Sequence, residues 1–361
     1  MNILLVTMEM NIGGAETHVL ELAKELQHQG HVVYVASAGG SLVAELEQNK
    51  VTHIYAPLKD KKITHVFSAM KILKQTIKDK KIEIVHAHAR IPGAICGFVC
   101  KKTKTHFVTT IHGIYRVNAI LKKITNWGEK TLAVSEDIRE HAIKTYNLNP
   151  DNVKVTINGI NLEKFKKQEI KENLNVAFDD SKKKIIHVSR LDNESSEVAK
   201  TLINLAPELD AESENGVQII IVGSGNYIEK LQQEASSKEN VLLTGASTDV
   251  EKLLNKADVF VGVSRAALEA MAVELPIVLV GNPEYGQGYQ GIFSSNSLEM
   301  AKSTNFTCRG LEKLNKEVLK KDILKVLKEN KEEMGKYNRN IVLSEYSVKK
   351  MASDALELYR F

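Results

Sequence analysis

The sequence predicts an α/β protein built from two doubly wound domains, each a parallel sheet with helices on both faces. Its 361 residues are more than twice the roughly 150 of one ordinary domain. Short β-branched runs alternate with helical patterns on both sides of a polar stretch at 161–183, which reads as a connector. An apolar content of 43% excludes a disordered chain.

The first half supplies strands and crossover helices in alternation, as a parallel sheet requires. Amphipathic spacing predicts helices over 16–29 and 68–80, and Cys96 and Cys100 are expected as two small buried side chains on another helix. The expected strands are 3–7, 31–36, 52–55, 82–86, 106–111, 130–134 and 153–157.

The second half repeats this alternation of strands and helices. We therefore expect domains at 1–165 and 166–340, followed by a closing helix within 341–361. Helices are predicted at 198–205, from 227, at 250–255 and at 266–272. The expected strands are 184–189, 217–222, 241–244, 258–262 and 276–280.

Charge and cysteine content indicate where the protein is located and which classes of partner are excluded. The net charge of +4 divides into +8 over residues 1–170 and −4 over residues 171–361. Three cysteines do not make a disulfide framework, which favours a cytoplasmic protein. No apolar run approaches the ~18 residues of a membrane span, so membrane contact would be peripheral. Basic and acidic groups are interspersed, which disfavours nucleic acid as a partner, and no metal-ligand spacing is present.

Candidate binding residues follow the predicted strands of the first half, where ligands of such sheets collect. Gly13 and Gly14 precede the first helix, with Glu16 in its first turn, and could let a phosphate or sugar approach helix amides. A plain strand-to-helix turn is the alternative, because the G-x-G-x-x-G pattern is absent. His86 and His88 end one strand and are either acceptor-side or structural residues. His112 ends another, and the following glycine would admit a ligand.

The second half carries candidate anion-binding residues in the same positions. Arg190 follows Ser189 at a strand end, where its guanidinium could hold a diphosphate or simply pair with a carboxylate. Glu269, one turn into a helix, could accept ribose hydroxyls or merely suit the helix dipole. The remaining candidates for contact with the donor phosphates lie at strand ends, in the loops that follow them or at the start of that helix: Ser189, Ser195, Gly223, Gly225, Gly245, Ser264, Arg265 and Ala266.

The order of these motifs resembles glycosyltransferase family 4, the retaining, nucleotide-sugar-dependent enzymes with the GT-B fold that build cell-surface glycans. The resemblance covers nearly the whole chain. It rests on Gly13-Gly14-Ala15-Glu16, His112-Gly113, Val134-Ser135-Glu136, Asn158-Gly159-Ile160, Ser189-Arg190-Leu191, Val222-Gly223-Ser224-Gly225 and Glu269-Ala270-Met271-Ala272.

The resemblance implies two Rossmann-like domains facing a cleft, an N-terminal one for a glycan or lipid-linked acceptor and a C-terminal one for the nucleotide-diphosphate sugar, with the closing helix crossing back to the first. By that similarity Arg190 would neutralise the donor diphosphate, Glu269 would hold the ribose, Gly14 would lie close to the donor and His112 would approach its sugar. The sugar donor is a substrate, and neither a cofactor nor a metal is expected.

Two positions depart from the family pattern. Ser195 stands where a second cation, lysine, is usual, and Val261 stands where a further glutamate is usual. Arg265, on the neighbouring loop, is a candidate substitute cation for the diphosphate. These departures favour one alternative to a transferase, a catalytically weakened relative that supports a partner transferase. A sugar-nucleotide epimerase with the GT-B fold is a second alternative. Donor base and sugar, acceptor, linkage and oligomeric state stay open.

Residues 113–130 allow two interpretations. They combine Trp127 and several aliphatic side chains with Arg116, Lys122, Lys123 and Lys130. The segment could lie on an anionic membrane surface, at the inner face of the membrane, or be an ordinary helix that packs its apolar face inside the domain.

Overall fold

The computed structural model describes residues 1–115, 117–172, 174 and 176–361. They form two compact units. The N-terminal unit comprises Met1–Gly159 and Ser347–Phe361, and the C-terminal unit comprises Ile160–Tyr346. The chain therefore leaves the first unit at Gly159, before the polar connector, and returns to it only for its last fifteen or so residues.

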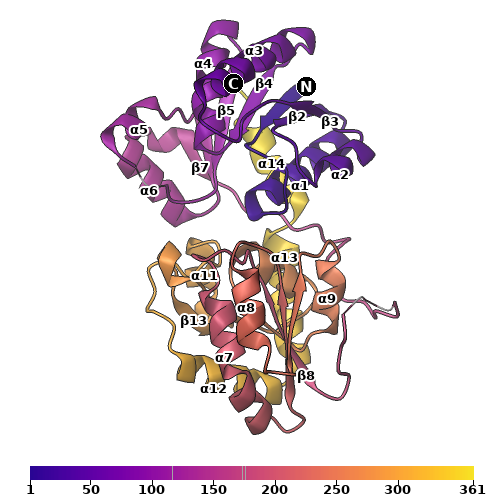
Figure 1. Ribbon diagram of the computed structural model, residues 1–361. Coiled ribbons are helices and arrows are strands. Elements are labelled where there is room, and N and C mark those ends of the chain that lie inside the picture. The colour runs from indigo at the N-terminus through magenta and orange to yellow at the C-terminus, as the bar shows by residue number, and fades with distance from the viewer. Residues whose placement is uncertain (116, 173, 175) are drawn as a thin grey trace. The chain divides into compact units, whose positions relative to one another are not determined.

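The N-terminal unit holds a seven-stranded parallel sheet in the order β3-β2-β1-β4-β5-β6-β7, visible in the upper part of Figure 1. Every strand lies within two residues of its predicted position at each end. The strands are β1 (Asn2–Val6), β2 (Val32–Ser37), β3 (Thr52–Tyr55), β4 (Ile84–His88), β5 (His106–Ile111), β6 (Lys130–Ala133) and β7 (Val153–Val155).

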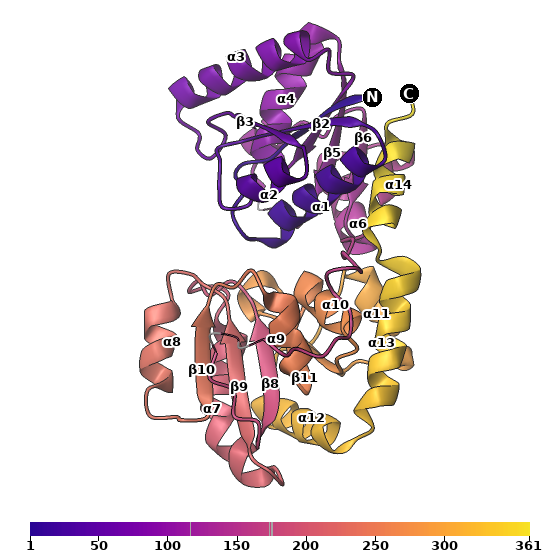
Figure 2. The same ribbon diagram turned by 90° about the vertical axis from the view of Figure 1, so that its right-hand side faces the viewer.

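Helices cover both faces of this sheet, which is why its strands are continuous apolar runs rather than alternating ones. In β1, Ile3 and Leu5 face a core with α1 and α14, whereas Leu4 and Val6 face a core with α3 and α4. The second view shows α14 beside α1 (Figure 2). The helices are α1 (Gly14–His28), α2 (Val43–Gln48), α3 (Ile63–Asp79), α4 (Arg90–Thr103), α5 (Ala119–Ile124), α6 (Glu136–Tyr146), η1 (Pro150–Asn152) and α14 (Val348–Leu358).

The C-terminal unit holds a six-stranded sheet in the order β10-β9-β8-β11-β12-β13. Five strands are parallel, as predicted, but β13 pairs with β12 in the antiparallel sense and was not expected from the sequence. The strands are β8 (Lys183–Val188), β9 (Val217–Val222), β10 (Val241–Gly245), β11 (Val259–Gly262), β12 (Ile277–Val280) and β13 (Tyr289–Ile292).

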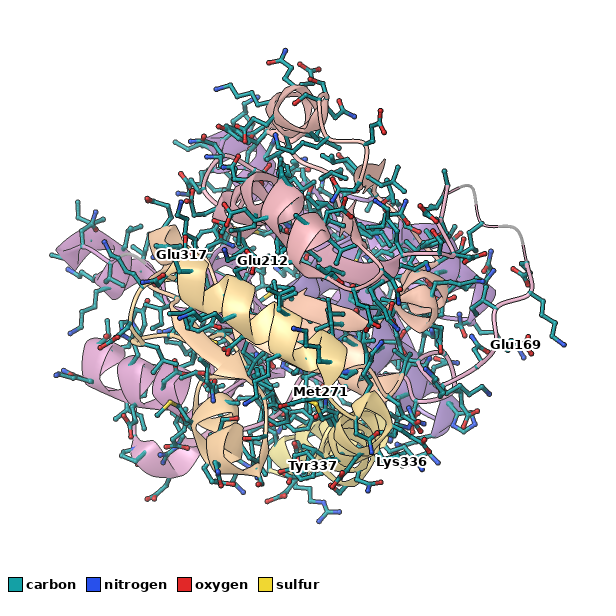
Figure 3. All side chains as sticks on the ribbon, turned by 90° about the horizontal axis from the view of Figure 1, so that it is seen from below. Glu169, Glu212, Met271, Glu317, Lys336 and Tyr337 are labelled. Carbon is teal, nitrogen blue, oxygen red and sulfur yellow. The ribbon has the colours of Figure 1, made fainter. Side chains whose placement is uncertain are left out.

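One core of this unit is formed by β8, β9, β11 and β12 together with the apolar faces of α7 and α12. At one end of these two helices, Lys320 of α12 forms ion pairs with Glu212 and Glu317, whose side chains are labelled together in Figure 3. The helices are α7 (Glu197–Glu212), α8 (Ile228–Ala235), α9 (Val250–Lys256), α10 (Ser264–Ala272), η2 (Pro283–Tyr285), η3 (Ser295–Ser297), α11 (Leu298–Ser303), α12 (Lys316–Lys328) and α13 (Lys331–Glu345).

Before β8 begins at Lys183, the described part of the connector contains no helix or strand and makes hydrogen bonds to helices of the C-terminal unit. Asn255 of α9 accepts a hydrogen bond from the backbone of Gln168 and donates one to the carbonyl of Lys166. Arg339 of α13 donates to the carbonyl of Phe165. In the described residues, no helix has the length and apolar character needed to cross a membrane.

Each sheet has a point where the strand order reverses, between β1 and β4 in the first unit and between β8 and β11 in the second. Loops leaving neighbouring strands diverge there, one to each face of the sheet, and leave a crevice at the carboxyl ends of the strands. Of the candidate residues, His88 ends β4, and Arg190 and Ser264 follow β8 and β11.

Candidate functional site

Arg190 emerges from the carboxyl end of β8, at the reversal point of the second sheet. Its side chain is 59% exposed, and its ion pair with Asp192 is loose, at 4.0 Å between Nε and Oδ2. The neighbouring strand β11 pairs with β8 through Phe260 and Ile186, so the chain leaves β11 beside the loop of Arg190. A cation is thus presented at the place where the sequence predicted one.

His187 joins these two strands, and sequence reasoning missed it. Its Nδ1–H donates to the carbonyl of Val261 at 2.7 Å, so its Nε2 accepts the hydroxyl hydrogen of Ser189 at 2.8 Å. Burial lowers the pKa of His187 to about 4, which keeps the ring neutral at pH 7. The imidazole therefore fixes the start of the Arg190 loop. A histidine one residue from a strand end carried no distinctive sequence signal.

Ser195 has its hydroxyl turned into its own loop. Oγ donates to the carbonyl of Arg190 at 2.8 Å and accepts from the backbone N–H of Asp192 at 3.1 Å. The residue is 6% exposed. Ser195 was predicted to face the donor phosphates in place of a lysine, but these bonds give it the role of closing the loop that presents Arg190.

The glycines after β9 allow two loops to approach each other. A Cβ on Gly223 would lie 1.8 Å from the carbonyl oxygen of Ser189, and one on Gly225 would lie 2.3 Å from the backbone of Leu191. Any larger residue at either position would push the Arg190 loop aside. Gly245, by contrast, ends β10 with φ +76 and open space around it.

The turn from β11 into α10 has a strained backbone and is held by a hydrogen bond from another segment of the chain. Ser264 has φ +62, an unusual conformation for a residue other than glycine, and its N–H donates to the carbonyl of Phe306 at 2.7 Å. Phe306 is itself fully buried in the segment 305–310. That segment thus holds the first turn of α10 in place.

Arg265 and Glu269 form an ion pair along the buried side of α10. Arg265 Nε lies 2.9 Å from Glu269 Oε1, and the side chains are only 7% and 12% exposed. The sequence placed Arg265 on a loop as a cation for the diphosphate, whereas the structure places it inside the helix beside a carboxylate. Ala266, also in the first turn, is half-buried and adds no side chain that would cover the helix amides.

In the N-terminal unit, Gly13 caps α1 and Gly14 begins it. A Cβ on Gly14 or on Gly113 would meet nothing within 4 Å, so packing of the chain itself does not require glycine at either position. Glu16, also in the first turn, is half-buried. The backbone here is open to an incoming group, as the prediction for Gly14 and His112-Gly113 requires.

Of the two roles that the sequence left open for His86, acceptor-side or structural, its contacts favour the structural one. It is fully buried, its Nδ1 lies 2.7 Å from the Tyr359 hydroxyl, and its Nε2 lies 2.7 Å from Thr110 Oγ1. Both ring nitrogens are therefore occupied. Tyr359 follows α14, so His86 ties the C-terminal segment to β4 and β5.

His88 and His112 meet at the reversal point of the first sheet, and His18 of α1 joins them. His88 Nδ1 lies 3.2 Å from His112 Nε2, and the centroids of the His18 and His112 rings are 4.8 Å apart. Burial and the neighbouring imidazoles lower the pKa of His88 and of His112 well below 6.5. The sequence did not single out His18, because a single histidine within a helical pattern does not reveal which residues it contacts in the folded protein.

The segment 113–130 does not behave as one packed helix; residue 116 lies outside the described residues. No residue of α5 is buried, and Ile120 and Ile124 are 73% and 57% exposed. The interpretation that its apolar face packs inside is therefore wrong for α5. It holds for Trp127, which is buried and stacks on Tyr115 with ring centroids 6.0 Å apart.

Two family models match the chain: Glycosyltransferase Family 4 over residues 12–164 and Glycosyl transferases group 1 over residues 182–304. The alpha-monoglucosyldiacylglycerol synthase of Streptococcus pneumoniae is 24% identical over 308 residues, covering 75% of this chain and 69% of that protein. The UDP-Gal:alpha-D-GlcNAc-diphosphoundecaprenol alpha-1,3-galactosyltransferase of Escherichia coli is 27% identical over 245 residues, or 57% and 60% of the two chains.

Among solved structures, that of HepE from Anabaena in complex with UDP and glucose superposes with a TM-score of 0.75 at 15% identity, covering 99% of this chain and 98% of that one. At that identity the likeness shows the fold. Together with the two family matches, which span most of both units, it confirms the resemblance found in the sequence: the chain belongs to glycosyltransferase family 4 and has the GT-B fold.

Proposed function

We propose that the protein is a retaining glycosyltransferase that moves a sugar from a nucleoside diphosphate donor to a glycan or lipid-linked acceptor in cell-surface polysaccharide synthesis. The C-terminal unit would hold the donor and the N-terminal unit the acceptor. One observation carries the proposal: an exposed arginine, Arg190, stands at the reversal point of the second sheet, next to the strand that leads into α10 and its oriented carboxylate, Glu269.

The departing diphosphate would be stabilised by local groups, because residues 171–361 carry a net charge of −4. Arg190 can approach an anion without breaking a tight ion pair, and the first-turn amides of α10 point toward the same edge of the sheet. A single preorganised donor at such a site is worth roughly 2.7–4 kcal/mol in the transition state.

Glu269 would accept the ribose hydroxyls. Its carboxylate is held by Arg265 in one orientation, so a sugar hydroxyl meets it without first having to order the side chain. The Anabaena neighbour was solved with UDP, which makes UDP-sugars the donors to test first. His112, whose pKa is far below neutrality, would contact the donor sugar as a neutral hydrogen-bonding group.

Two exposed surfaces of the N-terminal unit support an acceptor at an anionic membrane surface. Helix α3 exposes one stripe in which Ile63 and Phe67, 73% and 68% exposed, continue into Lys71, Lys74 and Lys78. Helix α5 exposes isoleucines next to lysines in the same way. Apolar groups beside lysines suit the boundary between headgroups and acyl chains.

The pneumococcal and Escherichia coli relatives carry a glucosyldiacylglycerol and a diphosphoundecaprenol in their names, so lipid-linked acceptors are the ones to test first. Purified protein would be incubated with labelled UDP-glucose, UDP-galactose or UDP-N-acetylglucosamine and anionic vesicles carrying candidate lipids. We expect one donor to transfer its label to the lipid fraction, with the anomeric configuration of the donor retained.

Two variants control this assay. Arg190→Ala should abolish transfer, whereas Arg360→Ala, which removes an exposed arginine of the N-terminal unit, should not. Formation of an isomeric nucleotide sugar without acceptor would instead identify an epimerase. A protein that binds no nucleotide and transfers no label would match the weakened relative suggested by Ser195 and Val261, and would overturn the proposal.

A further inference from the structure

Three imidazoles from distant parts of the sequence meet in the N-terminal unit. His18 comes from α1, His88 ends β4, and His112 follows β5. One ring nitrogen from each lies within 4.8 Å of the others. His88 Nδ1 and His112 Nε2 are 3.2 Å apart, close to the roughly 3.3 Å that separates two nitrogen ligands of a tetrahedral ion with bonds of about 2.0–2.1 Å.

The orientation of each ring in this cluster depends on its neighbours. For His18 that neighbour is Asn158. Asn158 Oδ1 can only accept, so the hydrogen bond of 3.1 Å to His18 places a proton on Nδ1 of that ring. With the proton on Nδ1, Nε2 is the nitrogen of His18 that can act as a metal ligand. Such a second partner, which fixes the tautomer and plane of a histidine, is what metal-binding histidines have in known sites.

His86 fixes the orientation of the His88 ring. The two rings stack with centroids 4.2 Å apart, and His86 is anchored on both sides by Thr110 and Tyr359. The plane of His88 is therefore set by a residue that cannot turn without breaking two hydrogen bonds.

The bonding around His88 is incomplete among the described residues. Its Nε2 is buried without a hydrogen-bond partner there, which costs roughly 1–3 kcal/mol for a polar atom. The next residue, Ala89, has φ +119 and ψ 163, in a region that only glycine ordinarily occupies. Strain and an unpaired polar atom at one position are typical of functional sites rather than of cores optimised for stability.

We propose that His18, His88 and His112 bind one divalent transition-metal ion of the zinc class. Three imidazole nitrogens favour Zn²⁺, Co²⁺, Ni²⁺ or Cu²⁺ over Mg²⁺ or Ca²⁺, which prefer oxygen ligands. His18 and His88 are buried and His112 is partly exposed, so the fourth position would open on the side of His112.

This site was not visible in the sequence, where the three histidines are 70 and 24 residues apart and match no ligand spacing. The proposal does not depend on the proposed transfer reaction, because metal binding can be measured without donor or acceptor. An ion here would contact His112, the residue expected to approach the donor sugar, so its presence would matter to that reaction.

The test is a titration of chelator-treated full-length protein with Co²⁺ and Zn²⁺, followed by calorimetry and by the visible spectrum of Co²⁺. We expect one equivalent per chain and the intense absorption of a four-coordinate cobalt ion. His18→Gln and His88→Gln should each weaken binding by about 100-fold or more, the upper end of what even second-partner substitutions cost. Asn158→Ala should weaken it by roughly 10-fold.

His106→Gln is the matched control, because His106 is half exposed and lies outside the cluster. It should bind metal like the unaltered protein. Since buried histidine variants can fail to fold, anomalous diffraction at the zinc edge from crystals of the unaltered protein gives an independent readout, with one peak expected among the three rings. Absence of one-equivalent binding, or a peak elsewhere, overturns the proposal.

Discussion

Arg265 Nε donates a hydrogen bond of 2.9 Å to Oε1 of Glu269 across one turn of α10. Both side chains are almost entirely buried, and Nη1 of Arg265 has no hydrogen-bond partner among the described residues. The pair therefore orients the carboxylate that we assign to the donor ribose, and it leaves one buried guanidinium hydrogen-bond donor for a further contact. Sequence reasoning had given these residues separate roles.

Replacing Arg265 by methionine should destabilise the protein more than replacing both partners. The single variant removes the guanidinium that donates to Oε1 of this nearly buried carboxylate, and breaking one contact of a buried ion pair costs about 3–5 kcal/mol in comparable cases. Arg265→Met/Glu269→Gln removes the charge as well and should regain part of that loss. Urea unfolding of the two variants measures the difference, and equal stability of Arg265→Met and the unaltered protein would contradict this role.

Folding stability should fall as the pH drops below about 6.5. The folded-state pKa is about 4 for His187 and about 3 for His86, because burial disfavours the charged ring, so the unfolded chain binds more protons in this range. Each such histidine should then contribute about 1 kcal/mol of lost stability per pH unit until its folded pKa is reached. Urea midpoints at pH 7 and pH 5 test this, and His187→Asn should show a shallower slope. A midpoint independent of pH would refute it.

The exposed apolar residues of α3 and α5 should bind anionic vesicles. Phe67→Ser and Ile120→Ser each remove a side chain whose burial is worth roughly 1.5–3 kcal/mol, so each should weaken binding by about 10-fold or more if it inserts fully. Sedimentation with vesicles rich in phosphatidylglycerol measures this, and added salt should weaken the lysine contribution. Val318→Ser, at an exposed site of the C-terminal unit, is the control. Equal binding by all three variants would exclude these surfaces.

A chelator should not abolish transfer, because the proposed donor site relies on Arg190 and helix amides. If the histidine cluster binds zinc as proposed, added Zn²⁺ should lower the transfer rate by engaging His112, and chelator should restore it. Rates of transfer with chelator, with Zn²⁺ and with both in turn provide the measurement. Loss of activity in chelator alone would show that transfer needs a bound metal ion and would contradict this prediction.

The fold was largely predictable because its strands are local signals. Residues such as Ile3 to Val6 are apolar at every position, which is typical of a strand buried on both faces, and glycines mark the turns that follow. The antiparallel β13 was missed because Tyr289–Ile292 is short and contains a glycine. The charged sequence of α13 has few apolar positions, and it is placed by contacts such as that of Asn338 with the carbonyl of Leu275, which are not encoded locally.

In the candidate site, the sequence predicted correctly only the positions of side chains that directly follow a strand. Arg190 is presented as expected, since a strand end dictates where the next side chain lies. The side chains of Ser195 and His86 form hydrogen bonds within the protein to partners that the sequence does not reveal. For His86 one partner is a tyrosine 273 residues away. His187 and His18 were missed for the same reason, because their roles depend on neighbours brought together by tertiary structure.

Calorimetric titration with UDP tests directly whether Arg190 holds the donor. We expect micromolar binding to the unaltered protein, loss of binding in Arg190→Ala, and unchanged binding in Arg360→Ala. Because Arg190 is 59% exposed, its substitution should leave the unfolding midpoint in urea unchanged, so lost binding could not be ascribed to misfolding. If Arg190→Ala binds UDP as tightly as the unaltered protein, the donor is not held where this structure places its arginine, and the account is wrong.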